Sequence, residues 1–274
     1  MNIQEALEIV SQTHSGMVRS HNEDSVAYDA PSGLAVLADG MGGYNAGEVA
    51  SGITISVMST EIKHRLESVH PEGKSESGED MGVALLREYV KKANAAIFSA
   101  AQSQPQYAGM GTTVVSALFY DNRVAVAHVG DSRMYRLRGE TFETITRDHS
   151  LLQEQIDGGM ISKEDARSSR NKNLVTRAVG IDAEVEVETH VHEVKVGDIY
   201  LLCSDGLNDM VEDADIGTAL GMLKANLPLA AGQLIEMAND NGGRDNVSVI
   251  LVKINGDFAA PRGWPAKLLY WLKS

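Results

Sequence analysis

The sequence predicts an α+β fold: a four-layer α/β/β/α sandwich in which two mainly antiparallel sheets lie between outer layers of helices. Three observations support this prediction. Short apolar runs rich in β-forming residues occur along much of the chain, and most follow one another closely, which favours antiparallel pairing. Two pairs of helical segments interrupt these runs. Sheets and helices that each carry one apolar face bury those faces by stacking in layers.

The N-terminal part of the chain passes from strand-like to helical segments. Residues 8–39 read as strands, whereas residues 46–68 carry apolar side chains at near-helical intervals, so we expect a helix there. A loop rich in Gly, Ser and Glu at 71–79 leads to a second predicted helix at about 80–103. One side of that helix presents Leu85, Leu86, Tyr89, Ala93, Ile97 and Ala100.

A β-hairpin is expected in the middle of the chain. The β-rich runs 112–120 and 123–129 are separated only by Asp121 and Asn122, two residues that favour tight turns. Two more β-rich runs continue this meander as far as residue 146.

The rest of the chain holds a polar excursion, the second pair of helices and the last strands. We expect the polar segment 149–175 to lie over the rim of the sandwich as a flap. The elements expected after it are strands at 184–194 and 199–203, helices at about 212–223 and 228–240, and a strand at 247–254. No Pro-rich linker or repeat divides the chain, so residues 1–256 form one predicted domain and 257–274 a C-terminal tail.

Composition argues against several functional classes. The chain has 274 residues, a formal net charge of −14 and a single cysteine, Cys203. Nucleic-acid binding is not expected, because it normally requires a basic surface. One cysteine leaves no intrachain disulfide and no Cys-rich zinc site. Without a stretch of about 18 apolar residues or a signal peptide, we expect a cytoplasmic protein with no membrane span.

Four aspartates stand at the ends of predicted strands. Asp39, Asp131 and Asp205 each follow a strand, and Asp245 precedes the last one. The end of one antiparallel strand lies beside the start of its neighbour, so these carboxylates can gather at one edge of the sandwich. Crowded carboxylates resist ionisation unless a cation neutralises them. Oxygen ligands suit Mg²⁺ or Mn²⁺ better than zinc, which favours a magnesium or manganese site.

Seven short motifs follow one another along the chain. They are Arg19-Ser-His-Asn-Glu23-Asp24, Asp39-Gly-Met-Gly-Gly43, Gly109-Met-Gly-Thr-Thr113, Gly130-Asp-Ser-Arg133, Asp148-His-Ser150, Ser204-Asp-Gly-Leu207 and Arg244-Asp-Asn246. In this order they resemble the motifs of the bacterial branch of the protein phosphatase 2C family, whose members are metal-dependent. The similarity extends from about Gly16 to Ile254.

The resemblance implies a set of metal ligands. Asp39 would bridge two central Mn²⁺ or Mg²⁺ ions, and the Gly40 carbonyl oxygen would bind one of them. Asp205 and Asp245 would complete the protein ligands of the other. Asp131, together with Asp205, resembles the ligands of a third, weaker metal, so two or three cations are expected.

The resemblance also implies roles around these metals. Arg19 would hold the substrate phosphate, while Glu23 and Asp24 would orient metal-bound waters. Human-type members carry a histidine directly after the Asp-Gly pair, but this chain has Met41 there. The general acid therefore stays open, and a metal-bound water is our expectation.

The implied activity is hydrolysis of phosphoserine and phosphothreonine in proteins by a metal-activated water, which reverses a Ser/Thr kinase. We expect a monomer whose partners are phosphorylated proteins, a Ser/Thr protein kinase among them. Two alternatives remain open: a catalytically silent pseudophosphatase that binds phosphoproteins, and a phosphatase of small phosphate esters. No aspartate ligand is lost, which argues against the pseudophosphatase.

The histidines and the cysteine are assigned no catalytic role. His190 and His192 share one face of a predicted strand, and we expect them to decorate an exposed strand. We interpret His128 and His149 as structural, and Cys203 as a buried strand residue.

Overall fold

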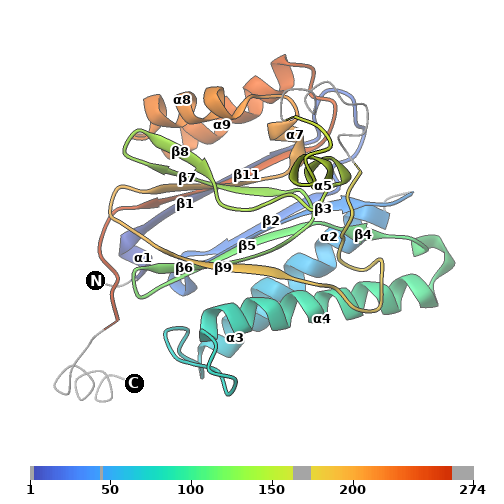
Figure 1. The fold of residues 1–274 in the computed structure, drawn as a ribbon, viewed down its shortest axis with the longest axis horizontal. Helices are drawn as coiled ribbons and strands as arrows, with labels where there is room; N and C mark the ends of the chain where they lie inside the picture. The colour runs from blue at the N-terminus through green and yellow to red at the C-terminus, as the bar shows by residue number, and fades with distance from the viewer. Residues whose placement is uncertain (1–2, 44–45, 163–173, 261–274) are drawn as a thin grey trace.

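The computed structural model describes residues 3–43, 46–162 and 174–260. In these ranges two sheets pack face to face, and helices cover the outer face of each sheet (Figure 1). Every pairing between the named strands is antiparallel. The predicted four-layer α+β sandwich is therefore confirmed.

The first sheet is built from both ends of the chain and its middle. Its strand order is β1 (Leu7–His14), β11 (Val247–Ile254), β10 (Ile199–Cys203), β7 (Arg133–Arg138) and β8 (Thr141–Thr144). The helices on its outer side are α7 (Asp205–Asn208), α8 (Asp213–Leu223) and α9 (Leu227–Asp240). Leu201 and Leu251 of this sheet pack against Ile216 and Leu234 of α8 and α9.

The second sheet carries the predicted hairpin. Its strand order is β2 (Asp24–Asp29), β3 (Leu34–Met41), β5 (Val114–Tyr120), β6 (Arg123–Val129) and β9 (Glu188–Glu193), with β4 (Gly111–Thr112) paired to β3. The helices on its outer face are α2 (Ala46–Ser56), α3 (Ile62–Leu66) and α4 (Met81–Ser103), and α1 (Ile3–Ala6) precedes β1. The turn residues Asp121 and Asn122 have φ values of 45° and 53°, as a tight hairpin turn requires.

Side chains of the central strands point alternately to the two faces of the sheet, and both faces are buried and apolar. In β3, Leu34 and Val36 face the helices, whereas Ala35 and Leu37 face the other sheet. This explains why the strand reads as a continuous apolar run rather than an alternating one. None of the helices in the described ranges combines the length and apolar character needed to cross a membrane.

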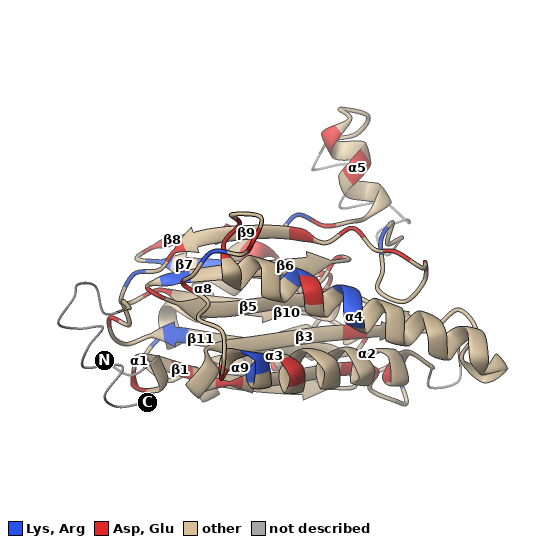
Figure 2. Ribbon diagram, turned by 90° about the horizontal axis from the view of Figure 1, so that it is seen from below, with Lys and Arg blue, Asp and Glu red and all other residues tan. Residues whose placement is uncertain are grey.

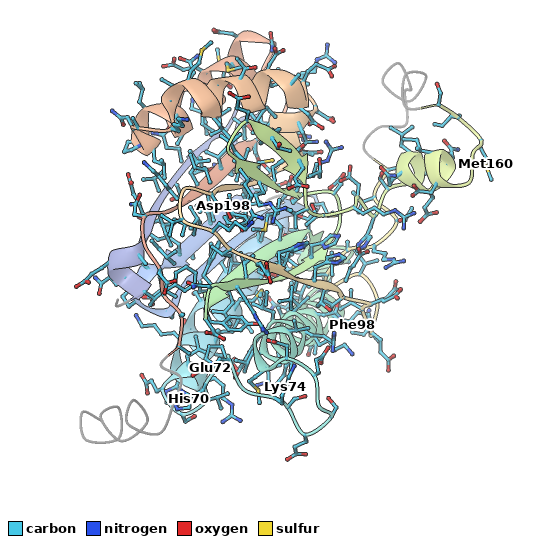
Figure 3. The ribbon with its side chains drawn as sticks, turned by 60° about the vertical axis from the view of Figure 1, so that its left-hand side comes forward. His70, Glu72, Lys74, Phe98, Met160 and Asp198 are labelled. Carbon is cyan, nitrogen blue, oxygen red and sulfur yellow. The ribbon has the colours of Figure 1, made fainter. Side chains whose placement is uncertain are left out.

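The segments expected to form a flap and a C-terminal tail are described only in part. Helix α5 (Leu151–Asp157) begins at Ser150, whose hydroxyl accepts the Gln153 N–H at 3.2 Å. The helix stands away from the two sheets, and Met160 beyond it points outward (Figures 2 and 3). Residues 163–173 of the expected flap and 261–274 of the expected tail lie outside the described residues. Phe258 is buried in the core between the sheets.

Candidate metal centre

Four aspartates reach one edge of the sandwich from different elements. Asp39 lies near the end of β3, and Asp131 follows β6 after one glycine. Asp205 begins α7 directly after Ser204, and Asp245 stands two residues before β11. Besides burial, the charges of Asp131, Asp205 and Asp245 raise the pKa of Asp39, and those of Asp131 and Asp245 raise the pKa of Asp205, so the structure brings together the side chains that the sequence placed at strand ends.

The register of the second sheet holds Asp39 beside Asp24 and Thr113. Asp24 and Asp39 are paired directly across β2 and β3. Thr113 donates its N–H to the Asp39 carbonyl oxygen at 2.8 Å, and the Asp39 N–H donates to Thr113 Oγ1 at 3.1 Å. The same hydroxyl lies 2.7 Å from Ser132 Oγ, next to Asp131. These bonds tie the end of β3 to the turn that carries Asp131.

Strands β10 and β11 bring Asp205 beside Asp245. The Ser204 N–H donates to a carbonyl oxygen of β11 at 3.1 Å, which extends the strand pairing toward Asp205. A Cβ atom on Gly206 would lie 2.0 Å from the Asn246 carbonyl oxygen. The backbone after Asp205 therefore touches the backbone after Asp245, and only glycine allows this approach.

Polar side chains join the two sheets beneath the aspartates. Ser204 Oγ donates to Asp24 Oδ2 at 2.8 Å, which links the first sheet to the second. Asn246 Oδ1 accepts the Glu23 N–H at 2.7 Å, and the Asn246 amide donates to two carbonyl oxygens before β2, at 3.0 and 2.8 Å. Asn246 thus anchors the segment that carries Arg19 and Glu23.

Arg19 reaches the aspartates from the segment between β1 and β2. Its Nη2 donates to Asp245 Oδ2 at 2.7 Å, and the side chain is 56% exposed. The hydrogen bond and charge of Asp245 raise the pKa of Arg19. Burial raises the pKa of Glu23, whose carboxylate fits against Gly47, where a Cβ would lie 2.8 Å from Glu23 Oε2. Both residues are therefore held beside the aspartates.

The structure shows why position 40 requires a glycine, which the sequence alone did not. A Cβ atom there would lie 2.2 Å from the Gly47 carbonyl oxygen and 2.7 Å from the Glu23 carbonyl oxygen. The Gly40 N–H also donates to that Glu23 oxygen at 3.2 Å. The close crossing of these three backbone segments fixes Asp39 against the start of α2.

Burial and mutual repulsion raise the pKa values of the clustered carboxyls. The pKa of Asp39 lies well above its usual range, first because the group is buried and then because Asp24 and Asp205 are near. The pKa of Asp205 is raised by burial and by Asp131. Burial raises the pKa of Asp131 to about 7 and that of Asp24 to about 6. Several of these carboxyls can be ionised together without a large cost in free energy only when cations are bound beside them.

A cavity of about 420 Å³ opens beside the aspartates. Asp131, Asp205 and Asp209 line one part of it, and side chains of α5 line another. Arg133 at its wall makes a two-pronged ion pair with Asp148, with Nε 2.9 Å from Oδ1 and Nη2 2.7 Å from Oδ2. Part of the cavity thus lies directly beside the carboxylates of Asp131 and Asp205.

Three contacts of the centre were not predicted. The motifs contain Arg133, Asp148 and Asn246, but nothing in their spacing indicates that Arg133 pairs with Asp148 or that Asn246 holds the Glu23 segment. The bond from Ser204 to Asp24 crosses between sheets and leaves no local pattern in the sequence.

Comparison with known proteins identifies the family of the chain. The profile described as protein phosphatase 2C matches residues 12–233. "Serine/threonine phosphatase stp" of Listeria welshimeri is 37% identical over 249 residues, covering 89% of this chain and 94% of that protein. "Serine/threonine protein phosphatase PstP" of Mycobacterium tuberculosis is 39% identical over 248 residues, covering 90% of this chain but 45% of the longer relative.

Solved structures of serine/threonine phosphatases have the same fold as this chain. The Mycobacterium tuberculosis PstP/Ppp phosphatase superposes with a TM-score of 0.80 at 38% identity, covering 91% of this chain and 99% of that one. The PstP catalytic domain in complex with two manganese ions gives 0.79 at 38% identity, with the same coverage. Stp1 from Staphylococcus aureus gives 0.79 at 35% identity, covering 91% and 96%. Since the profile, the sequence relatives and the folds all coincide over most of the molecule, this chain belongs to the protein phosphatase 2C family.

Proposed function

We propose that this protein hydrolyses phosphoserine and phosphothreonine in proteins, with Mn²⁺ or Mg²⁺ held at the aspartate centre. The observation that carries the proposal is the group of buried carboxyls at one edge of the sandwich, where the pKa values of Asp39 and Asp205 are raised well above their usual range. The relatives named as serine/threonine phosphatases support the choice of substrate.

The residues present fit hard divalent cations. Asp39, Asp131, Asp205 and Asp245 provide carboxylate oxygens, and Gly40 adds a carbonyl oxygen with no side chain to screen it. Oxygen donors of this kind suit Mg²⁺ and Mn²⁺. The relative solved with two manganese ions supports at least two cations, and Asp131 is our proposed ligand for a third. When bound, the cations supply an activated water at neutral pH and offset charge on the phosphoryl group.

The chain's own side chains would bind and orient the substrate. Arg19 contacts Asp245 through Nη2, and its other guanidinium N–H groups can donate to phosphate oxygens in a planar fork. Its exposed position lets a phosphorylated side chain reach it from solvent. Glu23 and Asp24 lie beneath the same edge, where they can accept hydrogen bonds from water. The thioether of Met41 has no proton to give to the leaving alkoxide.

The remaining assignments complete the proposal. We propose residues 1–256 as the catalytic domain, with the flap at 149–175 beside the cavity and a tail at 257–274. We infer a cytoplasmic monomer that acts on phosphorylated proteins, including a Ser/Thr protein kinase; the acidic net charge and the exposed Arg19 side chain are consistent with this.

The test is phosphate release from a phosphothreonine peptide with and without Mn²⁺. We expect turnover that chelation abolishes, and a loss of at least about a hundredfold in Asp39→Ala and Asp205→Ala, as expected when a metal ligand is removed. Asp240→Asn, an exposed change at the end of α9, is the matched control and should keep full activity.

Three outcomes would overturn the proposal. Full turnover in EDTA would show that the carboxylates do not work through cations. Faster hydrolysis of small phosphate esters than of phosphopeptides would identify a different substrate class. Tight phosphopeptide binding without any turnover would instead identify a pseudophosphatase.

A further inference from the structure

A separate group of nitrogen and oxygen donors lies on strands β6 and β9. Among the residues that the structure describes, His128, Glu188 and His190 offer ligand atoms that all lie within 4.8 Å of one another. His128 and Glu188 are direct partners across the two strands, and His190 lies two positions further along β9. Because side chains alternate along a strand, this register puts all three on the same face of the sheet.

His128 is in the form that binds metal ions. Its Nε2 lies 2.9 Å from the Arg147 carbonyl oxygen, and since a carbonyl only accepts, Nε2 carries the proton. Nδ1 is then an unprotonated nitrogen, and it is buried without a hydrogen-bond partner. Burial lowers the pKa of His128 to about 4, so the ring stays neutral. A neutral imidazole oriented by a carbonyl on its other nitrogen is typical of metal ligands.

Glu188 and His190 are already in contact and remain accessible. His190 Nε2 lies 2.8 Å from Glu188 Oε1. The side chains of Glu188 and His190 are 29% and 36% exposed, so an ion can approach from their side. Two donors on one tetrahedral ion with bonds of about 2.0–2.1 Å lie roughly 3.3 Å apart. The contact between these two groups therefore needs to open by only about 0.5 Å to admit a cation.

We propose that His128, Glu188 and His190 form a second metal site, which binds Zn²⁺ and leaves the remaining coordination to water. Two imidazoles and one carboxylate are a donor set that zinc accepts readily. Imidazole nitrogen selects zinc and similar transition ions over Mg²⁺, which prefers oxygen. The site thus differs from the aspartate centre in the kind of cation it takes. His128 and His190, which the sequence alone indicated as structural and exposed, acquire a joint role only through the register of β6 and β9.

His149 connects this site to the aspartate centre. Its Nε2 lies 3.1 Å from Glu188 Oε2, the carboxylate oxygen that does not face His190. Its Nδ1 accepts the Gly130 N–H at 3.2 Å, and its backbone N–H donates to the Gly130 carbonyl oxygen at 2.9 Å. Gly130 directly precedes Asp131. An ion on Glu188 Oε1 would leave Oε2 on His149, and so would fix the edge strand β9 to the turn that carries Asp131.

The experiment is a Co²⁺ titration of the whole protein in excess Mg²⁺, followed by visible absorption. Mg²⁺ occupies the oxygen cluster but competes poorly for imidazole. Co²⁺ bound by two imidazoles in a four- or five-coordinate site gives an intense visible band, whereas six-coordinate oxygen sites give weak ones. We expect a band that saturates at one Co²⁺ per chain and disappears when one equivalent of Zn²⁺ is added.

Variants locate the ion. Glu188→Gln and His190→Asn should each weaken Co²⁺ and Zn²⁺ binding by at least about tenfold, since even changes next to a ligand lower metal affinity by about 10–100-fold. His192→Asn is the matched control, because His192 lies on the same strand and face but outside the three donors. Near-ultraviolet circular dichroism verifies that each variant is folded. If His190→Asn does not fold, the metal affinity of Glu188→Gln decides whether these residues bind the ion.

The proposal fails if no intense band appears, if the band survives both ligand changes, or if His192→Asn removes it equally. None of these results would affect the proposed phosphatase activity, which depends on the aspartates and is assayed with Mg²⁺ or Mn²⁺ alone.

Discussion

Replacing Asp131 with asparagine should stabilise the metal-free protein, and the gain should grow with pH. The Asp131 carboxyl is 6% exposed, and burial together with nearby Asp148 raises its pKa to about 7 from a usual 3.8. A raised carboxyl pKa contributes stability that is complete below the unfolded pKa and is lost as pH rises through the folded pKa. The wild-type protein in chelator should therefore lose stability between about pH 4 and pH 7. The substitution Asp131→Asn keeps the shape of the side chain but removes its charge.

The magnitude follows from the two pKa values. Each pH unit between them is worth about 1.4 kcal/mol. Relative to a side chain that does not titrate, Asp131 then destabilises the folded state by about 2 kcal/mol at pH 5, where the folded carboxyl must hold a proton that the unfolded one has lost, and by about 4 kcal/mol at pH 8, where it is ionised in both states. The advantage of Asp131→Asn should accordingly be about 2–3 kcal/mol larger at pH 8 than at pH 5.

The assay is urea unfolding in EDTA at both pH values, followed by circular dichroism. Asp240→Asn, which removes an exposed carboxylate, is the control and should shift the unfolding free energy by less than about 0.5 kcal/mol at either pH. Adding Mn²⁺ should reverse the order of stability at pH 8, because the cation neutralises the cluster of carboxylates in the wild type and binds less well once Asp131 is replaced. An Asp131→Asn variant that is no more stable than wild type at pH 8 in chelator would refute the electrostatic account of the cluster.

Three further predictions concern backbone fit, the ion pair of the buried residue Asp198, and the cysteine. Gly40→Ala should abolish activity and destabilise by at least about 2 kcal/mol, since its Cβ would lie 2.2 Å from a carbonyl oxygen of α2, whereas Gly43→Ala, with nothing within 4 Å, should fold and melt normally. Asp198, labelled in Figure 3, is 1% exposed and lies 2.6 Å from Arg138 Nη2, so Asp198→Ala should lower the free energy of unfolding by about 1–3 kcal/mol in urea titrations; a loss below about 0.5 kcal/mol would contradict this. Cys203 is fully buried and burial raises its pKa, so a thiol reagent at pH 8 should label it in urea but not in the native protein, and fast native labelling would show an open core.

Local patterns in the chain were sufficient to predict most elements. The hairpin at Asp121-Asn122 and the helix over Met81–Ser103 follow from turn chemistry and apolar spacing, which act over a few residues. The position of Asp39 and Asp245 at strand ends was visible for the same reason. The polar composition of the segment 149–175 predicted an excursion but not the bounds of helix α5, which lies within it.

The fold class, the strand-end aspartates and the family motifs can be predicted from the chain, because each depends on residue types at short spacing. Which distant side chains meet is visible only in three dimensions: Ser204 with Asp24, Asn246 with Glu23, and His128 with Glu188 and His190. Those contacts depend on strand register and on how one sheet lies over the other. Register and sheet stacking are set by the packing of the whole core, so no short stretch of sequence carries them.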